Sequence, residues 1–140
     1  MRKKNLRKNH PAIADSHHNI GLVYDNQGNY EEALKHHEAG LYIWQAALDK
    51  SPLQVARSHD SVGSIYQKQG NYLKALEHYQ MSLRLRVIIL GEEHLDVADI
   101  YCNLGSIYIL QQHYSLALES YQRALRIYSK IHGEEHPDVA

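Results

Sequence analysis

The sequence predicts an all-α protein, a superhelical α-solenoid built from antiparallel helix pairs. Two observations lead to this prediction: the chain matches itself when it is shifted by 42 residues, and apolar side chains recur every three or four positions within each repeat. Repeat units 52–93 and 94–135 agree at 20 of 42 positions without gaps, and units 10–51 and 52–93 agree at 14. Helix pairs repeated in this way bury their apolar faces only by stacking on one another.

Each repeat unit reads as two helices separated by a short break. In the first two units the break is Gln-Gly-Asn, at Gln27–Asn29 and Gln69–Asn71, and glycine ends a helix at little conformational cost. The third unit has Gln112 at the glycine position, where we expect some strain. The spacing predicts helices over residues 11–26, 30–48, 53–68, 72–90, 95–110 and 114–131.

Small residues at a fixed register predict where the paired helices approach closely. A glycine inside a helix costs about 1 kcal/mol relative to alanine, so three at one register indicate a packing requirement. The glycines of the first helices are Gly21, Gly63 and Gly105, and the matching small residues of the second helices are Ala33, Ala75 and Ala117. The three prolines lie at or near the start of a first helix, where a missing N–H is harmless; they are Pro11, Pro52 and Pro137.

Both ends of the sequence continue the repeat. Leu6 is in register with Leu48 and Leu90, so residues 1–9 read as the tail of a second helix, and residues 136–140 read as the start of another first helix. We therefore expect one array over residues 1–140, and a segment of a longer array, natural or engineered. A natural short protein with frayed ends is the alternative.

Composition and charge exclude several classes of protein. Lys and Arg number 15 against 16 Asp and Glu, and no basic stripe beyond residues 2–8 is evident, so we expect no nucleic-acid partner. The longest apolar run, Val87–Leu90, is far shorter than the ~20 residues of a membrane helix, so we expect no membrane partner. The single cysteine, Cys102, forms no intrachain disulfide, which favours a reducing compartment and a cytoplasmic location.

Residue patterns for catalysis, cofactors or metals are weak, so we expect no enzyme, no cofactor and no metal. The strongest metal pattern pairs His132 with His136, but the string is HGEEH, which differs from HExxH and falls at a helix–helix turn. His17 and His59 stand where the repeat has an aromatic residue, so packed imidazoles are the expected account. Acidic pairs such as Glu31–Glu32 read as complements to a helix dipole.

Three segments resemble tetratricopeptide repeats: NIGLVYDNQGNYEEALKHHEAGL, SVGSIYQKQGNYLKALEHYQMSL and NLGSIYILQQHYSLALESYQRAL. The matching motif positions are Gly21, Tyr24, Ala33 and Gly40; Gly63, Tyr66, Ala75 and Ser82; and Gly105, Tyr108, Ala117 and Ala124. The 42-residue length, with GEEHLDVA and GEEHPDVA at the joins, resembles the kinesin-light-chain type, although the first join, DKSPLQVA, departs from it.

The resemblance implies a peptide-binding groove lined by the first helix of each unit. Its candidate residues are Asp15, His18, Asn19, Leu22, Asp25 and Asn26; Arg57, Asp60, Ser61, Ser64, Gln67 and Lys68; and Asp99, Cys102, Asn103, Ser106, Ile109 and Leu110. Asn19 and Asn103 match a position where the family's amide holds a peptide backbone, whereas Ser61 does not; these amides alternatively only solvate the groove.

We therefore predict a non-enzymatic protein-interaction scaffold that binds a peptide or a helix. Because groove aspartates outnumber Arg57 and Lys68, a neutral to mildly basic ligand fits best, and Ile109 and Leu110 offer an apolar end. One alternative is a structural segment that associates head to tail with other copies through bare end surfaces, Leu6 at one end and Tyr121, Leu125, Tyr128 and Ile131 at the other. Another is an accessory array of a larger signalling protein.

Overall fold

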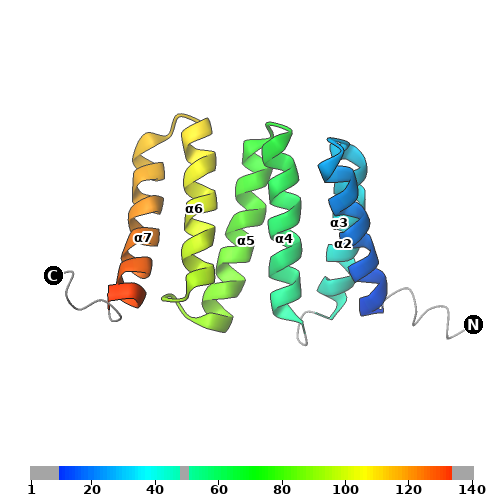
Figure 1. Cartoon of the computed structure of the whole chain (residues 1–140), viewed down its shortest axis with the longest axis horizontal. Coiled ribbons are helices and arrows are strands. Elements are labelled where there is room, and N and C mark those ends of the chain that lie inside the picture. The colour runs from blue at the N-terminus through cyan, green and yellow to red at the C-terminus, as the bar shows by residue number, and fades with distance from the viewer. Residues whose placement is uncertain (1–9, 48–50, 134–140) are drawn as a thin grey trace, which may run out of the picture. The chain divides into compact units, whose positions relative to one another are not determined.

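The structure, a computed structural model, describes residues 10–47 and 51–133, and α-helices account for most of them (Figure 1). No β-strand occurs within these ranges. The helices are α2 (Pro11–Asn26), α3 (Tyr30–Ala46), α4 (Pro52–Lys68), α5 (Tyr72–Leu90), α6 (Leu95–Leu110) and α7 (Tyr114–Gly133). Every predicted helix is present, with ends within two residues of the predicted ones.

The chain divides into two compact bodies, the N-terminal body (Met1–Ser82) and the C-terminal body (Leu83–Ala140), and α5 crosses the division. The predicted partial units 1–9 and 136–140 lie outside the described residues. So do Leu6, Leu48, His136 and Pro137, and the predicted single array over 1–140 remains a prediction.

Local chemistry explains where the first helices begin. Pro11 and Pro52 are the first residues of α2 and α4, as predicted. The sequence did not reveal that histidines cap two of these helices: the His10 Nδ1 accepts a hydrogen bond from the Ala12 N–H, and the His94 Nδ1 accepts one from the Asp96 N–H, both at 3.0 Å. A side-chain acceptor at this position satisfies one of the free N–H groups of the first turn.

The turn between paired helices has the same geometry in each repeat. Gly28 and Gly70 have φ angles of +79° and +81°, and Gln112 occupies the same left-handed region at +65°. After each, the next N–H donates to a tyrosine carbonyl five residues earlier, at 2.8–2.9 Å; the acceptors are Tyr24, Tyr66 and Tyr108. This bond closes the helix end in the Schellman manner.

Replacement of Gln112 by glycine should therefore stabilise the protein. An L-residue in the left-handed region costs about 1–2 kcal/mol, and glycine avoids this cost, so we expect the free energy of unfolding to rise by about 1 kcal/mol. The converse variant, Gly70→Gln, places a side chain where no atom lies within 4 Å, so its expected loss reports backbone strain alone. Urea unfolding of both variants checks this; a Gln112→Gly chain no more stable than the parent would contradict it.

In the N-terminal body the register glycines allow the paired helices to touch. A Cβ at Gly21 would lie 2.7 Å from the His37 ring, and a Cβ at Gly63 would lie 3.2 Å from the Tyr79 ring. His37 and Tyr79 are both buried, as is Ala33. The predicted close approach is therefore confirmed for the first two repeats.

The C-terminal body repeats this packing between α6 and α7, which run antiparallel in Figure 1. A Cβ at Gly105 would lie 2.8 Å from the Tyr121 ring. Its core is a buried cluster with Leu83 and Val87 of α5 packed against it; the members are Val97, Ala98, Ala124 and Ile127.

Candidate functional site

All twelve candidate residues on α2 and α4 have partly or fully exposed side chains. The opposite sides of these helices carry the buried residues Ala14 and Gly21 on α2, and Val55, Val62 and Ile65 on α4. The first helices of the N-terminal body therefore present the predicted residues to solvent, which is what a binding face requires.

An ion pair joins two of these candidates across α2 and α4. The Lys68 Nζ lies 2.8 Å and 3.0 Å from the two carboxylate oxygens of Asp25, and it also lies 6.0 Å from the centre of the Tyr30 ring. The pair neutralises one acidic and one basic candidate at once. The face is consequently less charged than a count of its residues indicates.

A shallow hollow lies between α2 and α4 near Asp15, His18, Gln54 and Arg57. Its volume of about 20 Å³ is enough for about one water, which needs roughly 10–15 Å³ of such space. Burial, followed by the nearby Arg57 charge, lowers the pKa of His18. The hollow is too small for a metabolite, so this face suits an extended ligand lying on the surface.

On α6 in the C-terminal body, three of the six candidates bind to α7. The Tyr128 hydroxyl donates to the Asp99 carboxylate, and its oxygen lies 4.0 Å from the Cys102 Sγ. The Ser106 and Tyr121 hydroxyls lie 3.0 Å apart. The hydrogen bond to Asp99 raises the pKa of Tyr128. These three side chains therefore support the helix pair, whereas Ile109 and Leu110 are exposed.

The two asparagines that resemble backbone-holding residues are accessible. Asn19 is exposed and Asn103 is half-buried. Within residues 10–47 and 51–133, neither amide has a recorded hydrogen-bond partner. Each amide thus has both its donor and its acceptor available.

Histidine pairs link the first and second helices of the first two repeats. The Nδ1 atoms of His17 and His36 lie 3.0 Å apart, and those of His59 and His78 lie 2.9 Å apart. A tyrosine ring stacks on the second imidazole of each pair, Tyr24 on His36 and Tyr66 on His78, at 5.7 Å and 5.6 Å between ring centres. The 42-residue recurrence of both members was a sequence signal of this contact that we missed.

Two imidazoles of the first two repeats, those of His37 and His59, are deeply buried. Burial, followed by the charge of His18 near His37 and of His78 near His59, lowers the pKa of each buried imidazole to about 4. Both side chains are therefore neutral at pH 7. The expectation of packed imidazoles is confirmed for His59, which is buried, while His17 is half-buried.

Neither a metal cage nor a membrane span is present in the described part of the chain. No group of three or more His, Cys, Asp and Glu side chains there is arranged to hold a metal ion. None of the described helices is both long and apolar enough to cross a membrane.

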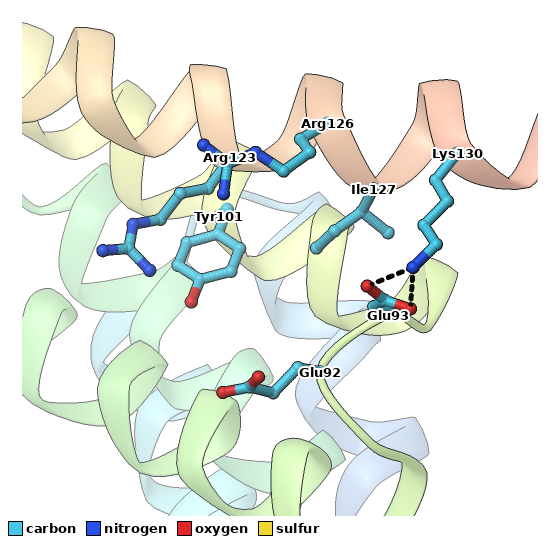
Figure 2. Close-up of a pocket in the computed structure, with 7 residues that line it drawn as sticks. All are labelled: Glu92, Glu93, Tyr101, Arg123, Arg126, Ile127 and Lys130. Carbon is cyan, nitrogen blue, oxygen red and sulfur yellow. Dashed lines mark hydrogen bonds and ion pairs between the residues drawn. The ribbon is translucent and has the colours of Figure 1, made fainter.

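A charged pocket in the C-terminal body was not predicted from the sequence. One side of α7 contributes three basic side chains to this pocket, those of Arg123, Arg126 and Lys130 (Figure 2). Their spacing of three and four positions places them on one helix face, which is the signal that sequence reasoning overlooked. The other lining residues are Glu92, Glu93, Tyr101 and Ile127.

Only part of the charge in this pocket is paired. The Lys130 Nζ lies 2.7 Å and 2.8 Å from the carboxylate oxygens of Glu93. The Arg123 guanidinium lies 5.8 Å from the centre of the Tyr101 ring and 3.5 Å from Glu119. The cavity of about 130 Å³ is below the roughly 300 Å³ at which small-molecule pockets begin. It has room for one small group and no more.

Comparison with known proteins gives a family match that covers most of the chain. A family model described as tetratricopeptide repeat matches residues 12–85 and 54–130. No curated protein sequence matches the chain.

Solved structures of repeat proteins share the fold. BtubC (BKLC) from P. vanneervenii has a TM-score of 0.79 at 24% identity, over 86% of this chain and 48% of that one. Nearly identical TPR-like repeats of a Podosopora anserina protein assigned as a kinesin light chain have a TM-score of 0.76 at 22% identity, over 92% of this chain and 61% of that one. The chain therefore spans about half of the first protein and 61% of the second.

The TPR domain of Arabidopsis FLU has a TM-score of 0.62 at 18% identity, over 85% of this chain and 91% of that domain. At these identities the likeness concerns the fold alone, and it confirms the predicted class, an all-α helical-repeat solenoid. Because the repeat model matches residues 12–130, the chain belongs to the tetratricopeptide repeat family.

Proposed function

We propose that this chain is a non-enzymatic protein-interaction scaffold that binds a peptide or helix of a partner protein on the exposed face of its first helices. The observation that carries the proposal is that none of the eighteen candidate side chains on α2, α4 and α6 is buried. The two bodies each offer such a face, α2 and α4 in one and α6 in the other. The small hollow by Asp15 and Arg57 favours a ligand that lies along the helices.

Amides and apolar side chains are the recognition groups on these faces. The Asn19 and Asn103 amides can each accept from a peptide N–H and donate to a peptide C=O. Ile109 and Leu110 at the end of α6 offer apolar contact. A ligand segment with one apolar side chain and free backbone groups matches this combination.

The charges favour a neutral to mildly basic ligand. Lys68 is engaged by Asp25, which leaves Arg57 as the other basic candidate against the exposed Asp15 and Asp99. Cationic segments are attracted to such a face, and strongly acidic ones, nucleic acid included, are repelled. The proposal places the protein in the cytoplasm, since the free Cys102 requires no oxidising compartment.

Peptides selected from a random library on the immobilised chain test this proposal. We expect Asn19→Ala to weaken the selected peptides that bind the N-terminal body about tenfold, and Asn103→Ala to weaken those that bind the C-terminal body by the same factor, since a lost pair of peptide hydrogen bonds is worth at least about 1.4 kcal/mol. Gln80→Ala, an exposed amide on the second helix α5, is the matched control and should leave affinity unchanged. Peptides that shift NMR signals of α3, α5 and α7 while α2, α4 and α6 stay unperturbed would refute the proposal.

Head-to-tail association is a second candidate function, and a specific observation favours it. Ile20 and Val23 on α2 are 42% and 56% exposed, whereas their register equivalents Val62 and Ile65 on α4 are both 0% exposed. The α2 face thus repeats a surface that α4 buries inside the protein. An exposed apolar face of this kind marks a contact site.

The outer face of α7 has the complementary character. Leu118 and Leu125 are 59% and 63% exposed, whereas Leu41, the equivalent of Leu125 on α3, is 7% exposed. Since α3 and α4 pack together in the N-terminal body, α7 of one copy and α2 of another can form the same contact. Such a contact is heterologous, and it can propagate from copy to copy.

Sedimentation of two charged variants tests this candidate. Leu125→Glu and Val23→Lys should each abolish self-association, and an equimolar mixture should form a one-to-one dimer, because each variant retains the face that the other lacks. Leu73→Glu, on an exposed leucine of α5, is the matched control. If Leu125→Glu alone dissociates the protein, the contact is symmetric through α7; a parent chain that stays monomeric at millimolar concentration rules out association.

A further inference from the structure

The charged pocket of α7 contains a basic group without an internal partner. Arg126 has no hydrogen bond or ion pair with any described residue, although Lys130 is held by both carboxylate oxygens of Glu93. Arg123 interacts with the Tyr101 side chain, whose hydrogen bond raises the pKa of the guanidinium, and it also makes an exposed contact with Glu119 at 3.5 Å, of a kind that contributes about 0–1 kcal/mol. Among the described residues, Arg126 is therefore available to an external anion, and the Arg123 guanidinium beside Tyr101 lies one helical turn away on the same helix face.

The surroundings define the shape of that anion. Figure 2 shows the Arg123 and Arg126 side chains beside the Tyr101 ring, with Ile127 on the same side of α7. Guanidinium groups bind tetrahedral oxyanions through paired N–H donors, and they do so better than the point charge of a lysine. The cavity of about 130 Å³ is small against the roughly 300–1,000 Å³ of pockets that hold whole metabolites, which suits a single oxyanion group.

We propose that the Arg123–Arg126 end of this pocket binds a phosphoryl group carried on a side chain of a partner protein. A phosphorylated side chain carries about −1.5 to −2 charges at pH 7, which matches two guanidinium groups, whereas a carboxylate matches only one. Tyr101 and Ile127 supply apolar contact to the rest of the phosphorylated side chain. This inference rests on the proposed function in one respect, that the ligand belongs to a protein; the residues that bind it are none of the eighteen first-helix candidates.

Two carboxylates in the pocket select against polyanions. Glu92 and Glu93 lie at the α5–α6 turn, on the other side of the pocket from the helix that carries the arginines (Figure 2). A nucleic-acid backbone would bring further phosphates close to these carboxylates. Repulsion of the neighbouring phosphates therefore favours an isolated phosphoryl group over a chain of them.

An NMR titration at constant ionic strength tests the proposal on the whole chain, with inorganic phosphate and a capped phosphoserine as probes. We expect both probes to shift the amide signals of α7 around Arg123–Ile127 to saturation. Arg126→Gln should weaken the affinity for the capped phosphoserine on the order of tenfold, because one of the two guanidinium groups that bind it is removed. Glu92→Gln should strengthen it severalfold, because a repelling charge is removed; a purely structural role of Glu92 would not produce this gain.

The register provides the matched control. Arg84 precedes Arg126 by one repeat of 42 residues and is exposed on α5, so Arg84→Gln should leave binding unchanged. Equal losses in the Arg84 and Arg126 variants would show nonspecific attraction and overturn the proposal. The proposal would also be overturned if the chain bound inorganic phosphate but failed to bind the capped phosphoserine. Binding of a short single-stranded oligonucleotide more tightly than the capped phosphoserine would overturn it as well. The two proposals fail separately: phosphoserine binding that persists when Asn19→Ala leaves the library-selected peptides bound contradicts only the proposed function, and loss of peptide binding in Asn19→Ala without any phosphoserine binding by the parent chain contradicts only this site.

Discussion

Replacement of Gly63 by leucine should destabilise the protein by about 3 kcal/mol, the upper range for an overpacked core. A Cβ at this position would lie 3.2 Å from the Tyr79 ring and 3.4 Å from the Ala75 carbonyl oxygen. The remaining carbons of leucine extend further into the same contact. Because Tyr79 is buried on α5, we expect the added carbons to force α4 and α5 apart.

Urea unfolding of Gly63→Leu measures the loss, and Arg57→Leu on the exposed side of α4 is the matched control. The control should change the free energy of unfolding by less than about 0.5 kcal/mol, as is usual for surface positions. A loss of that size in Gly63→Leu would instead mean that Gly63 faces solvent and that the repeat register is wrong.

Mild acid should destabilise the protein through its buried imidazoles. The pKa values of His37 and His59 are lowered to about 4 in the folded chain, against 6.5 for free histidine, so folding favours their neutral forms. Their contribution to stability is complete above pH 6.5 and is lost as the pH falls from 6.5 toward 4. We expect a loss of about 2 kcal/mol for each imidazole between pH 7 and pH 4.5.

The repeats themselves supply the variants for this test. His37→Tyr introduces the residue that stands at the same register in the later repeats, Tyr79 and Tyr121. The double variant His59→Tyr, His78→Ser introduces the residue types that stand at the equivalent positions of the third repeat, Tyr101 and Ser120. Each should reduce the difference between the free energies of unfolding at pH 7 and pH 4.5 by about 2 kcal/mol. His113→Gln, on an exposed loop residue, should leave the difference unchanged; equal acid sensitivity in all three variants would assign the effect to other groups.

The sequence by itself determined the helices and their register. Both depend on interactions within one repeat, because an apolar period of three to four residues and a glycine in the left-handed region act locally. Gly28 and Gly70 therefore mark the helix ends in the sequence as they do in the structure. The repeat strengthens such a prediction, because Gly21, Gly63 and Gly105 occupy the same register and are therefore expected to make the same contact.

The pairing of side chains between helices was decided only by the tertiary structure. Lys68 meets Asp25, and Tyr128 meets Asp99, across 43 and 29 residues of sequence, and no local pattern marks such partners. The same holds for the α7 pocket, where Glu93 pairs with Lys130 and where Arg126 has no ion pair with any residue that the structure describes. A sequence fixes how many charges a face carries, but the free energy of each charge depends on distance and solvent exposure, which exist only once the helices have packed.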